Sequence, residues 1–472
     1  MRGRRPGPLD EGSIGSGKRV LYRASSSVQA TYPAGAKPIT PSPVIPHRIP
    51  RPEHNISRAN ISENALKVLY RLKGAGYQAY LVGGGVRDLL LGREPKDFDV
   101  ATDALPEEVR RVFRNCRLIG RRFRLAHVRF GREIIEVATF RAQHAGDEGG
   151  RVLEDGMIMR DNVYGSLEED ALRRDFTVNA LYYDITDFSV LDFAGGMADI
   201  AEGRLRLIGD PETRYREDPV RMLRAVRFAA KLGFNIDPAS EAPLPVMGHL
   251  LQGVPAARLF EEVLKLFHAG TALAAFERLR HHGLFAQLFP ASEAALAREQ
   301  FDFPLTFVAR GLENTDRRIA EAKPVNPAFL FAVLLWEPVR LRAAELMADE
   351  PPVAATQQAA TEVLARQQGV VAIPRRFTLP MREIWTLQHR FEFRQGKRPL
   401  RLLTHPRFRA AYDFLVLRAE AGEADPELAR WWTEFQENDP EARTRIAAAV
   451  PKQRRRRPRR RRRARPEAGA EG

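Results

Sequence analysis

Cysteine is almost absent from the sequence, because Cys116 is the one example among 472 residues. A single thiol cannot close a disulfide within the chain, and it excludes a zinc site built from several cysteines. Long apolar runs are also missing. The longest covers 328–336, whereas a membrane helix needs about 20 residues. The basic residues 1–10 lack the apolar segment of a secretory signal. We therefore expect a cytoplasmic protein that does not insert into membranes.

Positive charge is in excess, with 75 Lys and Arg against 60 Asp and Glu and a net charge of +15. The excess lies at the two ends of the chain. Residues 452–472 carry eleven basic and two acidic side chains, and residues 1–57 carry nine basic and three acidic ones. The segment between them is neutral overall. The composition therefore separates a neutral, foldable middle from two basic ends.

The C-terminal end, residues 448–472, includes ten arginines between Arg454 and Arg465. Such a segment repels itself and has little apolar surface to bury, so we expect it to be disordered in isolation. It is interpreted as an arm that binds nucleic-acid phosphates without regard to sequence. A tail that only keeps the protein soluble is the alternative. Residues 1–56, rich in Pro, Ser, Gly and Arg, are also expected to be disordered.

The pattern of apolar residues predicts an α+β fold. Residues 57–212 mix short strands with helices and are expected to form a small-sheet head, which is the candidate catalytic domain. Helical patterns dominate afterwards, and we divide them into a neck at 213–275 and a body at 276–447. The elements expected in the head are helices at 60–75, 87–91 and 106–113, strands at 80–82, 98–101 and 190–192, and a hairpin of 126–130 with 133–141. Residues 142–160 are expected to form a polar loop.

Two carboxylates, Asp97 and Asp99, stand two residues apart on a predicted strand. Successive side chains on a strand point to opposite faces, so both carboxylates share one face and Phe98 takes the other. Such a pair can hold Mg²⁺, a hard cation that prefers oxygen ligands, and metal ions at such a site promote phosphoryl or nucleotidyl transfer. A solvated surface pair is the alternative, because this spacing is common.

A glycine run precedes these carboxylates. Gly83, Gly84 and Gly85 follow a predicted strand and open a helix, so the backbone can approach a phosphate and offer it N–H groups. Arg87, one turn into the helix, can add positive charge. The run is not a Walker A loop, because no Gly-Lys-Ser/Thr follows it.

The segment VGGGVRDLLLG…KDFDVAT, within 82–102, resembles the nucleotidyltransferases related to DNA polymerase β. It is similar to their class II branch, which contains bacterial poly(A) polymerases and CCA-adding tRNA nucleotidyltransferases. Further segments resemble motifs of the same branch, and they are RRDFTVNA at 173–180, DFAGG at 192–196, RLIG at 206–209 and EDPVRMLRAVRF at 217–228. The similarity runs from about residue 54 to at least 289, and more loosely to about 447.

The resemblance implies roles for particular residues. Asp97 and Asp99 would hold Mg²⁺ as catalytic carboxylates, with Asp175 of the RRDFT segment as the third acid. Glu136, on the predicted strand 133–140, is the geometric rival for that place. Gly83, Gly84 and Arg87 would cradle the triphosphate, and Arg174 would reach the nucleotide sugar or phosphate.

The helix expected to open at Asp218 carries the argument for base selection. Asp218 suits the N-cap, and the helix has a basic stripe consisting of Arg221, Arg224, Arg227 and Lys231. A carboxylate accepts from an exocyclic amine, and an arginine donates to a ring nitrogen. An Asp218/Arg221 pair therefore suits adenine or cytosine and leaves groups unpaired with guanine or uracil. Arg224 and Arg227 would support the pair. A solvated basic face is the alternative.

The two activities of the branch differ elsewhere in the sequence. The segment LIGRRFRLAHV at 118–128 resembles the poly(A) polymerase signature, although Arg121, Arg122 and Arg124 can also be read as solvated surface. An arginine-rich tail suits varied RNA 3′ ends. The resemblance therefore implies template-independent polyadenylation of RNA 3′ ends, with ATP and RNA as substrates and a monomeric state. A CCA-adding enzyme is the first alternative, and a non-catalytic RNA-binding protein is the second.

Basic–aromatic stretches at 382–401 and 407–414 are a further candidate RNA contact, by stacking and charge. For any single residue in them, a place in the core or on a solvated face is the competing interpretation. The histidines of this half of the chain, including His281 and His282, show no metal-ligand spacing.

Overall fold

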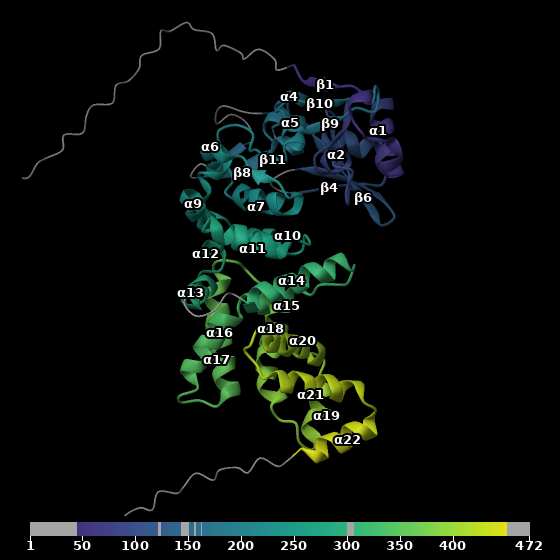
Figure 1. Ribbon diagram of the computed structural model, residues 1–472. Coiled ribbons are helices and arrows are strands. Elements are labelled where there is room, and N and C mark those ends of the chain that lie inside the picture. The colour runs from purple at the N-terminus through teal and green to yellow at the C-terminus, as the bar shows by residue number, and fades with distance from the viewer. Residues whose placement is uncertain are drawn as a thin grey trace, which may run out of the picture. The chain divides into compact units, whose positions relative to one another are not determined.

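The computed structural model describes residues 45–120, 124–142, 151–154, 157–161, 163–299 and 306–450. The expected α+β architecture is confirmed. A mixed sheet forms the head, and the rest of the described chain is almost entirely helical (Figure 1).

The head is built on an eight-stranded sheet with the order β1-β10-β9-β2-β3-β6-β5-β4. Every neighbouring pair is antiparallel except β3 with β6, which run parallel. The strands are β1 (His47–Ile49), β2 (Ala79–Val82), β3 (Asp99–Thr102), β4 (Cys116–Ile119), β5 (Leu125–Phe130), β6 (Glu133–Thr139), β9 (Leu181–Tyr183) and β10 (Val190–Asp192). The expected hairpin of β5 and β6 is confirmed, with Gly131 in the left-handed region at its turn.

Both faces of the sheet bury apolar side chains. On one face, Leu81, Val100 and Val137 join a core that includes residues of α1 (Glu63–Gly74) and α3 (Pro106–Val112). On the other, Val82 and Tyr182 pack with Ala171 of α4 (Leu167–Leu172). Because side chains alternate along each strand, β2 supplies both cores with consecutive residues.

Two expectations for the head were wrong. The first described residues, 45–56, are not a disordered extension, because β1 pairs with β10 and buries Ile49, and Ile56 is also buried. The three-residue strand is too short to be recognised from sequence, and its partner lies about 140 residues away. Within the expected polar loop, β7 (Arg151–Glu154) and β8 (Met157–Asp161) form a two-stranded sheet. Residues 143–150 lie outside the described residues, as do 1–44 and the arginine tail.

The neck packs around α7 (Val220–Leu232). Its expected apolar stripe is confirmed, because Met222, Ala225, Ala229 and Leu232 are buried, and Gly233 ends the helix with φ +75°. Helices α10 (Ala256–Phe267) and α11 (Ala272–His281) contact α7 (Figure 1). Helix α6 (Pro211–Glu217) spans the expected boundary between head and neck, and α8 (Pro238–Glu241) and α9 (Leu244–Met247) follow α7. A small parallel pair joins β11 (Arg204–Leu205) of the head to β12 (Asn235–Ile236) of the neck.

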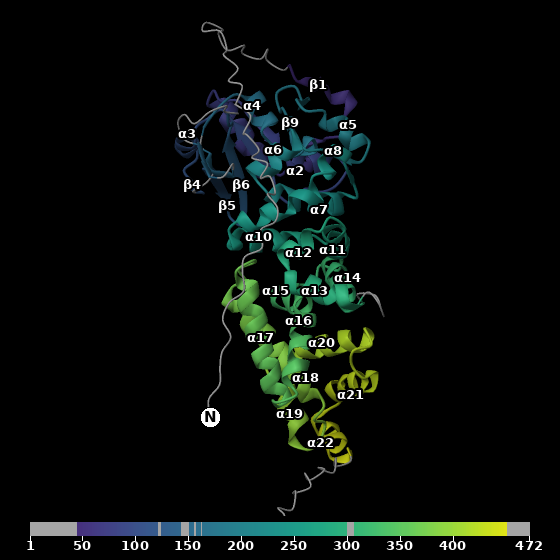
Figure 2. The ribbon, with the colours of Figure 1, turned by 90° about the vertical axis from the view of Figure 1, so that its left-hand side faces the viewer.

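The body continues the same apolar core. One cluster of buried residues runs from Phe176 through the neck to Leu417, and a second, from Leu387 to Ala447, joins the last helices. Figure 2 shows α19, α21 and α22 grouped together at this end. The helices are α12 (Leu284–Leu288), α13 (Pro290–Glu299), α14 (Thr306–Ala320), α15 (Pro327–Leu334), α16 (Trp336–Leu346), α17 (Pro352–Gln368), α18 (Arg375–Phe391), α19 (Lys397–Leu403), α20 (Phe408–Glu420), α21 (Pro426–Glu437) and α22 (Pro440–Ala449). None of the described helices is long and apolar enough to cross a bilayer.

Candidate active site

A cleft of about 320 Å³ lies where the sheet of the head meets the neck. Its lining combines acidic and basic side chains over a floor of strand residues. The polar members are Asp99, Glu136, Arg141, Asp170, Arg173, Arg174, Asp175, Asp218, Arg221 and Arg224. Seven of the residues singled out from sequence therefore share one cavity, although they come from four segments of the chain.

The acidic end of the cleft is formed by neighbouring strands. Asp99 opens β3, and the parallel register of β3 with β6 places it opposite Glu136. Asp97 lies on the exposed chain two residues before β3, with Phe98 buried between them. Burial, followed by the charge of Glu136, raises the pKa of Asp99 to about 6, and Asp97 contributes to the rise. A buried carboxylate with further negative charge beside it is stabilised by a bound cation.

The glycine loop borders this acidic group. Gly83 directly follows β2, has φ +76° and is the N-cap of α2 (Gly84–Leu90). A Cβ atom at this position would lie 3.6 Å from Nη1 of Arg174 and 3.8 Å from Oδ2 of Asp99. A side chain here would therefore be strained and would stand between the acidic group and the arginine. The helix begins three residues earlier than expected, so Gly84 and Gly85 belong to it.

Arg87 lies behind the loop. Its side chain is 2% exposed, and it donates to Asp88 at 2.6 Å and to Asn179 at 2.6 Å. The guanidinium also stands 5.2 Å from the centroid of the Phe228 ring. It therefore links α2 to the segment after Asp175 and to α7. Direct contact of Arg87 with a triphosphate stays a prediction.

Arg174 is held by two neighbours on its own side of the cleft. It donates to Asp170 at 3.0 Å and to the hydroxyl of Tyr182 at 2.8 Å, and Tyr182 donates in turn to Asp170 at 2.7 Å. Burial alone would lower the pKa of Arg174, but Tyr182 and Asp170 raise it above its ordinary value. The guanidinium is therefore a fixed positive charge beside the glycine loop, suited to a phosphate.

Asp175 forms a different set of contacts from the other two aspartates. Its carboxylate accepts from Arg224 at 2.7 Å, from Asn179 at 3.2 Å and from the backbone N–H of Phe176 at 2.8 Å. Burial alone would raise its pKa, but Arg224 and these hydrogen bonds hold the pKa at about 2. The structure therefore gives Asp175 an arginine partner on α7, and its role as a third metal ligand stays a prediction.

The segment containing Asp175 is held in place by the two motifs that follow it, DFAGG at 192–196 and RLIG at 206–209. The carboxylate of Asp192 accepts from the backbone N–H groups of residues 194–197 and caps α5 (Gly196–Ala201). Asp199 of that helix accepts from Thr177 at 2.6 Å and from Arg206 at 2.9 Å. A Cβ atom at Gly196 would lie 2.3 Å from the carbonyl oxygen of Thr177, which explains the glycine.

The neck forms the opposite wall through Asp218 and Arg221. The helix starts slightly later than expected, because Pro219 is the N-cap of α7, but Asp218 still accepts from the N–H of Val220 at 3.3 Å. Its second oxygen accepts from Arg258 of α10 at 2.8 Å. Arg221 donates to Glu217 at 3.1 Å. Both side chains line the cleft.

The rest of the basic stripe does not form a solvated face. Arg224 pairs with Asp175, and Lys231 stands 3.7 Å from Asp88. Arg227 lies 4.0 Å from Glu262 of α10, and burial lowers its pKa to about 10. The stripe therefore joins α7 to the head and to α10, and Arg227 is not among the residues that line the cleft.

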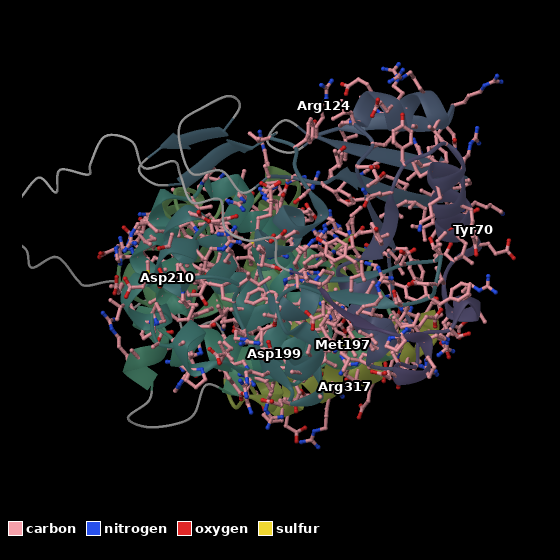
Figure 3. All side chains as sticks on the ribbon, turned by 90° about the horizontal axis from the view of Figure 1, so that it is seen from above. Tyr70, Arg124, Met197, Asp199, Asp210 and Arg317 are labelled. Carbon is pink, nitrogen blue, oxygen red and sulfur yellow. The ribbon has the colours of Figure 1, made fainter. Side chains whose placement is uncertain are left out.

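Sequence reasoning missed four residues that organise this site, namely Asp170, Tyr182, Arg258 and Glu262. Asp170 precedes Arg174 by four residues, a spacing at which opposite charges meet on a helix, so a signal was present. No local pattern connects Arg258 or Glu262 to α7. Of the signature arginines, Arg121 and Arg122 lie outside the described residues. Arg124 lies at the upper edge of the view from above (Figure 3). It pairs with Glu107 at 2.9 Å, and both side chains are about half exposed.

Comparison with known families gives three matches along the chain. The poly(A) polymerase head domain matches residues 79–206, which contain the acidic residues and the glycine loop. A probable RNA- and SrmB-binding site of polymerase A matches 233–296. The arginine-rich C-terminus of polymerase A matches 348–466.

Individual relatives agree with these matches. Poly(A) polymerase I of Salmonella typhimurium is 55% identical over 402 residues, covering 83% of this chain and 86% of its own. The CCA-adding enzyme of Bacillus pumilus is 36% identical over 250 residues, covering 53% and 60%. A solved tRNA-processing enzyme shares the fold, with a TM-score of 0.55 at 22% identity over 80% of this chain and 99% of its own. Together with the cleft, the matches show that the chain belongs to the poly(A) polymerase family of nucleotidyltransferases.

Proposed function

We propose that this protein adds adenylate residues to RNA 3′ ends without a template, as a polynucleotide adenylyltransferase. The observation that carries the proposal is one cleft that is lined by Asp99 and Glu136, by Arg174, and by Asp218 and Arg221. The identity of 55% to a named poly(A) polymerase over most of both chains supports this activity over CCA addition.

We infer that the acidic end of the cleft holds Mg²⁺ through Asp97, Asp99 and Glu136. Burial, and then the negative charges of Glu136 and Asp97, raise the pKa of Asp99, and a divalent cation bound among these oxygens would offset that cost. Oxygen-only donors suit Mg²⁺, Ca²⁺ and Mn²⁺, and a site of few carboxylates that is completed by substrate phosphates is typical of Mg²⁺. Bound there, the metal would activate the attacking hydroxyl and stabilise charge on the leaving group.

In the proposed reaction, the 3′ oxygen of the RNA forms a bond to the α-phosphorus of ATP. The bond from that phosphorus to the bridging oxygen breaks, and pyrophosphate leaves. Arg174, fixed by Asp170 and Tyr182, neutralises triphosphate charge beside Gly83. Its geometry exists before the substrate binds, so little reorganisation is needed when charge develops.

We propose that Asp175 positions the base-reading helix and does not bind metal. Its carboxylate holds Arg224 of α7, while Glu136 stands opposite Asp99. An Asp175→Glu variant would keep the charge but displace Arg224. It should lower kcat/KM for ATP without changing the metal concentration that gives half-maximal activity.

Adenine selection is assigned to Asp218 and Arg221. Asp218 would accept from the exocyclic amine of adenine, and Arg221 would donate to the ring nitrogen N1. Arg258 fixes the Asp218 carboxylate at 2.8 Å, so the acceptor is directed before the base arrives.

The direct test is an incorporation assay with a generic RNA 3′ end and each of the four nucleotides in turn. Long tails from ATP, and little product from the others, are expected. A parallel reaction supplies tRNA that lacks its 3′ end with ATP and CTP. Ordered addition of C, C and A that then stops would contradict polyadenylation and support the CCA-adding alternative.

A further inference from the structure

A basic segment of the body spans the end of α18, the connection at 392–396 and the first turn of α19. Residues 390–401, called here the basic loop, read RFEFRQGKRPLR and contain five basic side chains and one acidic one. Four of the five basic residues are exposed and the other is half-buried. They are Arg390, Arg394, Lys397, Arg398 and Arg401.

Within the part of the chain that the structure describes, none of these five side chains forms an ion pair with a carboxylate. Arginines close to them in sequence do form such pairs. Arg407 pairs with Glu383, and Arg409 pairs with Asp413, both at 3.0 Å. The basic loop therefore keeps its positive charge available for a partner outside the protein.

An exposed aromatic ring lies among these charges. Phe393 is 45% exposed, and the guanidinium of Arg398 stands 5.0 Å from the centroid of its ring. In a second pair, the guanidinium of Arg394 lies 5.8 Å from the centroid of the Trp431 ring on α21. Unstacked nucleic-acid bases bind to aromatic rings and guanidinium planes of this kind.

The loop is anchored at both ends. Trp432 of α21 donates to the carbonyl of Phe391 at 2.8 Å. The N–H of Gly396, which has φ +62°, donates to the carbonyl of Ala447 in α22 at 3.1 Å. In the sequence, the arginine-rich segment 452–472 begins a few residues after Ala447. The basic loop therefore lies next to the helix that leads into the most basic part of the chain.

We propose that the basic loop is a binding site for single-stranded RNA, separate from the catalytic cleft. The inference rests on the proposed function for its choice of RNA as the polyanion. Unpaired cations bind phosphates without reading sequence. Phe393 requires a base that is free to unstack, and a duplex does not offer one. The site would hold RNA upstream of the 3′ end that is being extended.

The test measures RNA binding by the full chain through fluorescence anisotropy, with no nucleotide present. The probe is a labelled 20-residue oligo(A), and salt is varied. The variant is R394Q/R398Q/R401Q. The matched control, R342Q/R409Q/R430Q, removes the same charge from arginines of the body that pair with Glu362, Asp413 and Glu427. The slope of log Kd against log salt should fall by about 2 in the first variant, at roughly 0.7 per phosphate contact.

The control should change that slope by less than about half as much, because its arginines already have partners. Phe393→Ala should weaken binding roughly tenfold, as expected for the loss of one stacked base, and Phe393→Trp should restore it. Lys397→Glu and Arg390→Glu, at exposed positions, repeat the charge test if the triple variant unfolds early.

Equal effects of the two triple variants would overturn the proposal, because net charge alone would then explain binding. Two results would overturn the single-strand assignment. One is that Phe393→Ala binds oligo(A) as tightly as wild type, and the other is that Phe393→Ala loses as much affinity for a 20-base-pair RNA duplex as it loses for oligo(A). Wild-type protein that binds oligo(A) normally but incorporates no adenylate would contradict the proposed function and leave this site standing.

Discussion

Helix α7 and the basic loop are both rich in positive charge, but they differ in what faces that charge. On α7, Arg224, Arg227 and Lys231 each lie beside a carboxylate supplied by the head or by α10. In the basic loop, the described residues offer no carboxylate to any of the five cations. Paired cations fix geometry, whereas unpaired ones retain their attraction for phosphate.

Burial explains why the two arrangements serve different ends. The Asp175 carboxylate is 11% exposed, so the loss of either member of its pair with Arg224 leaves a charge away from water. In the exposed pair of Arg409 with Asp413, solvent screens the interaction, and little stability depends on it. The charges in the cleft therefore matter because each is held at a fixed position. The charges on the basic loop matter because several of them together attract phosphate.

The largest expected effect tests the acidic end of the cleft. Asp99→Asn keeps the size of the side chain and removes its charge beside Glu136. We expect kcat for adenylate incorporation to fall by about 10³-fold or more, because charge stabilisation of the reacting phosphate is lost. An initial-rate assay at saturating ATP measures this, and the melting temperature serves as the control for folding. Activity within tenfold of wild type would show that Asp99 holds no essential metal.

The next effect concerns stability at the junction of head and neck. Asp175→Asn should lower the free energy of unfolding by about 3 kcal/mol, the lower end for a buried pair, because Arg224, which is 31% exposed, is left without its carboxylate partner. Replacing both residues, as D175N/R224M, should cost less than the sum of the single changes. Urea unfolding of the four proteins gives the coupling energy. If the losses in the free energy of unfolding of the two single variants add up to that of the double variant, the ion pair contributes no stability to the site.

The same carboxylate predicts a pH dependence. Its folded pKa, about 2, lies below the ordinary value of 3.8. Its contribution to stability is therefore complete above pH 4 and is lost as the pH falls towards 2, by about 2 kcal/mol in all. Asp175→Asn should flatten the stability curve in that interval relative to wild type. Unfolding followed by circular dichroism at each pH measures the difference.

A slightly smaller effect is expected in nucleotide choice. Asp218→Asn replaces one of two acceptor oxygens with an amide donor facing the base. We expect kcat/KM for ATP to fall roughly 10²-fold and discrimination against GTP to weaken, because the adenine amine loses its acceptor. Arg258→Gln should also lower kcat/KM for ATP relative to that for GTP, but by a smaller factor. If Asp218→Asn keeps the wild-type preference for ATP over GTP, the base is read by residues other than Asp218 at the start of α7.

The smallest effect is expected on the body surface. Arg409→Gln removes an exposed partner of Asp413 and should change the free energy of unfolding by less than about 0.5 kcal/mol. A loss as large as that of Asp175→Asn would erase the distinction between the buried and exposed pairs. Thermal unfolding of the two single variants, side by side, makes the comparison.

Much of the head, and the central helix of the neck, could be predicted from local sequence. The hairpin at Gly131, the helix after Ser62 and the apolar stripe of α7 each follow from patterns within about a dozen residues. Strand β1 could not be predicted, because its partner β10 is distant in sequence and its own signal covers three residues. The arginine stripe was visible, but its carboxylate partners were not, since they come from four separate elements.

The sequence by itself determined the family, the acidic and glycine motifs and the basic ends, because those signals lie in residue type and spacing. The tertiary structure alone decided which acid stands beside Asp99, what holds Asp175 and which arginines remain unpaired. These outcomes depend on strand register and on helix packing between distant segments. The interaction between two charges depends on their distance in space, and the spacing of residues along the sequence does not reveal that distance.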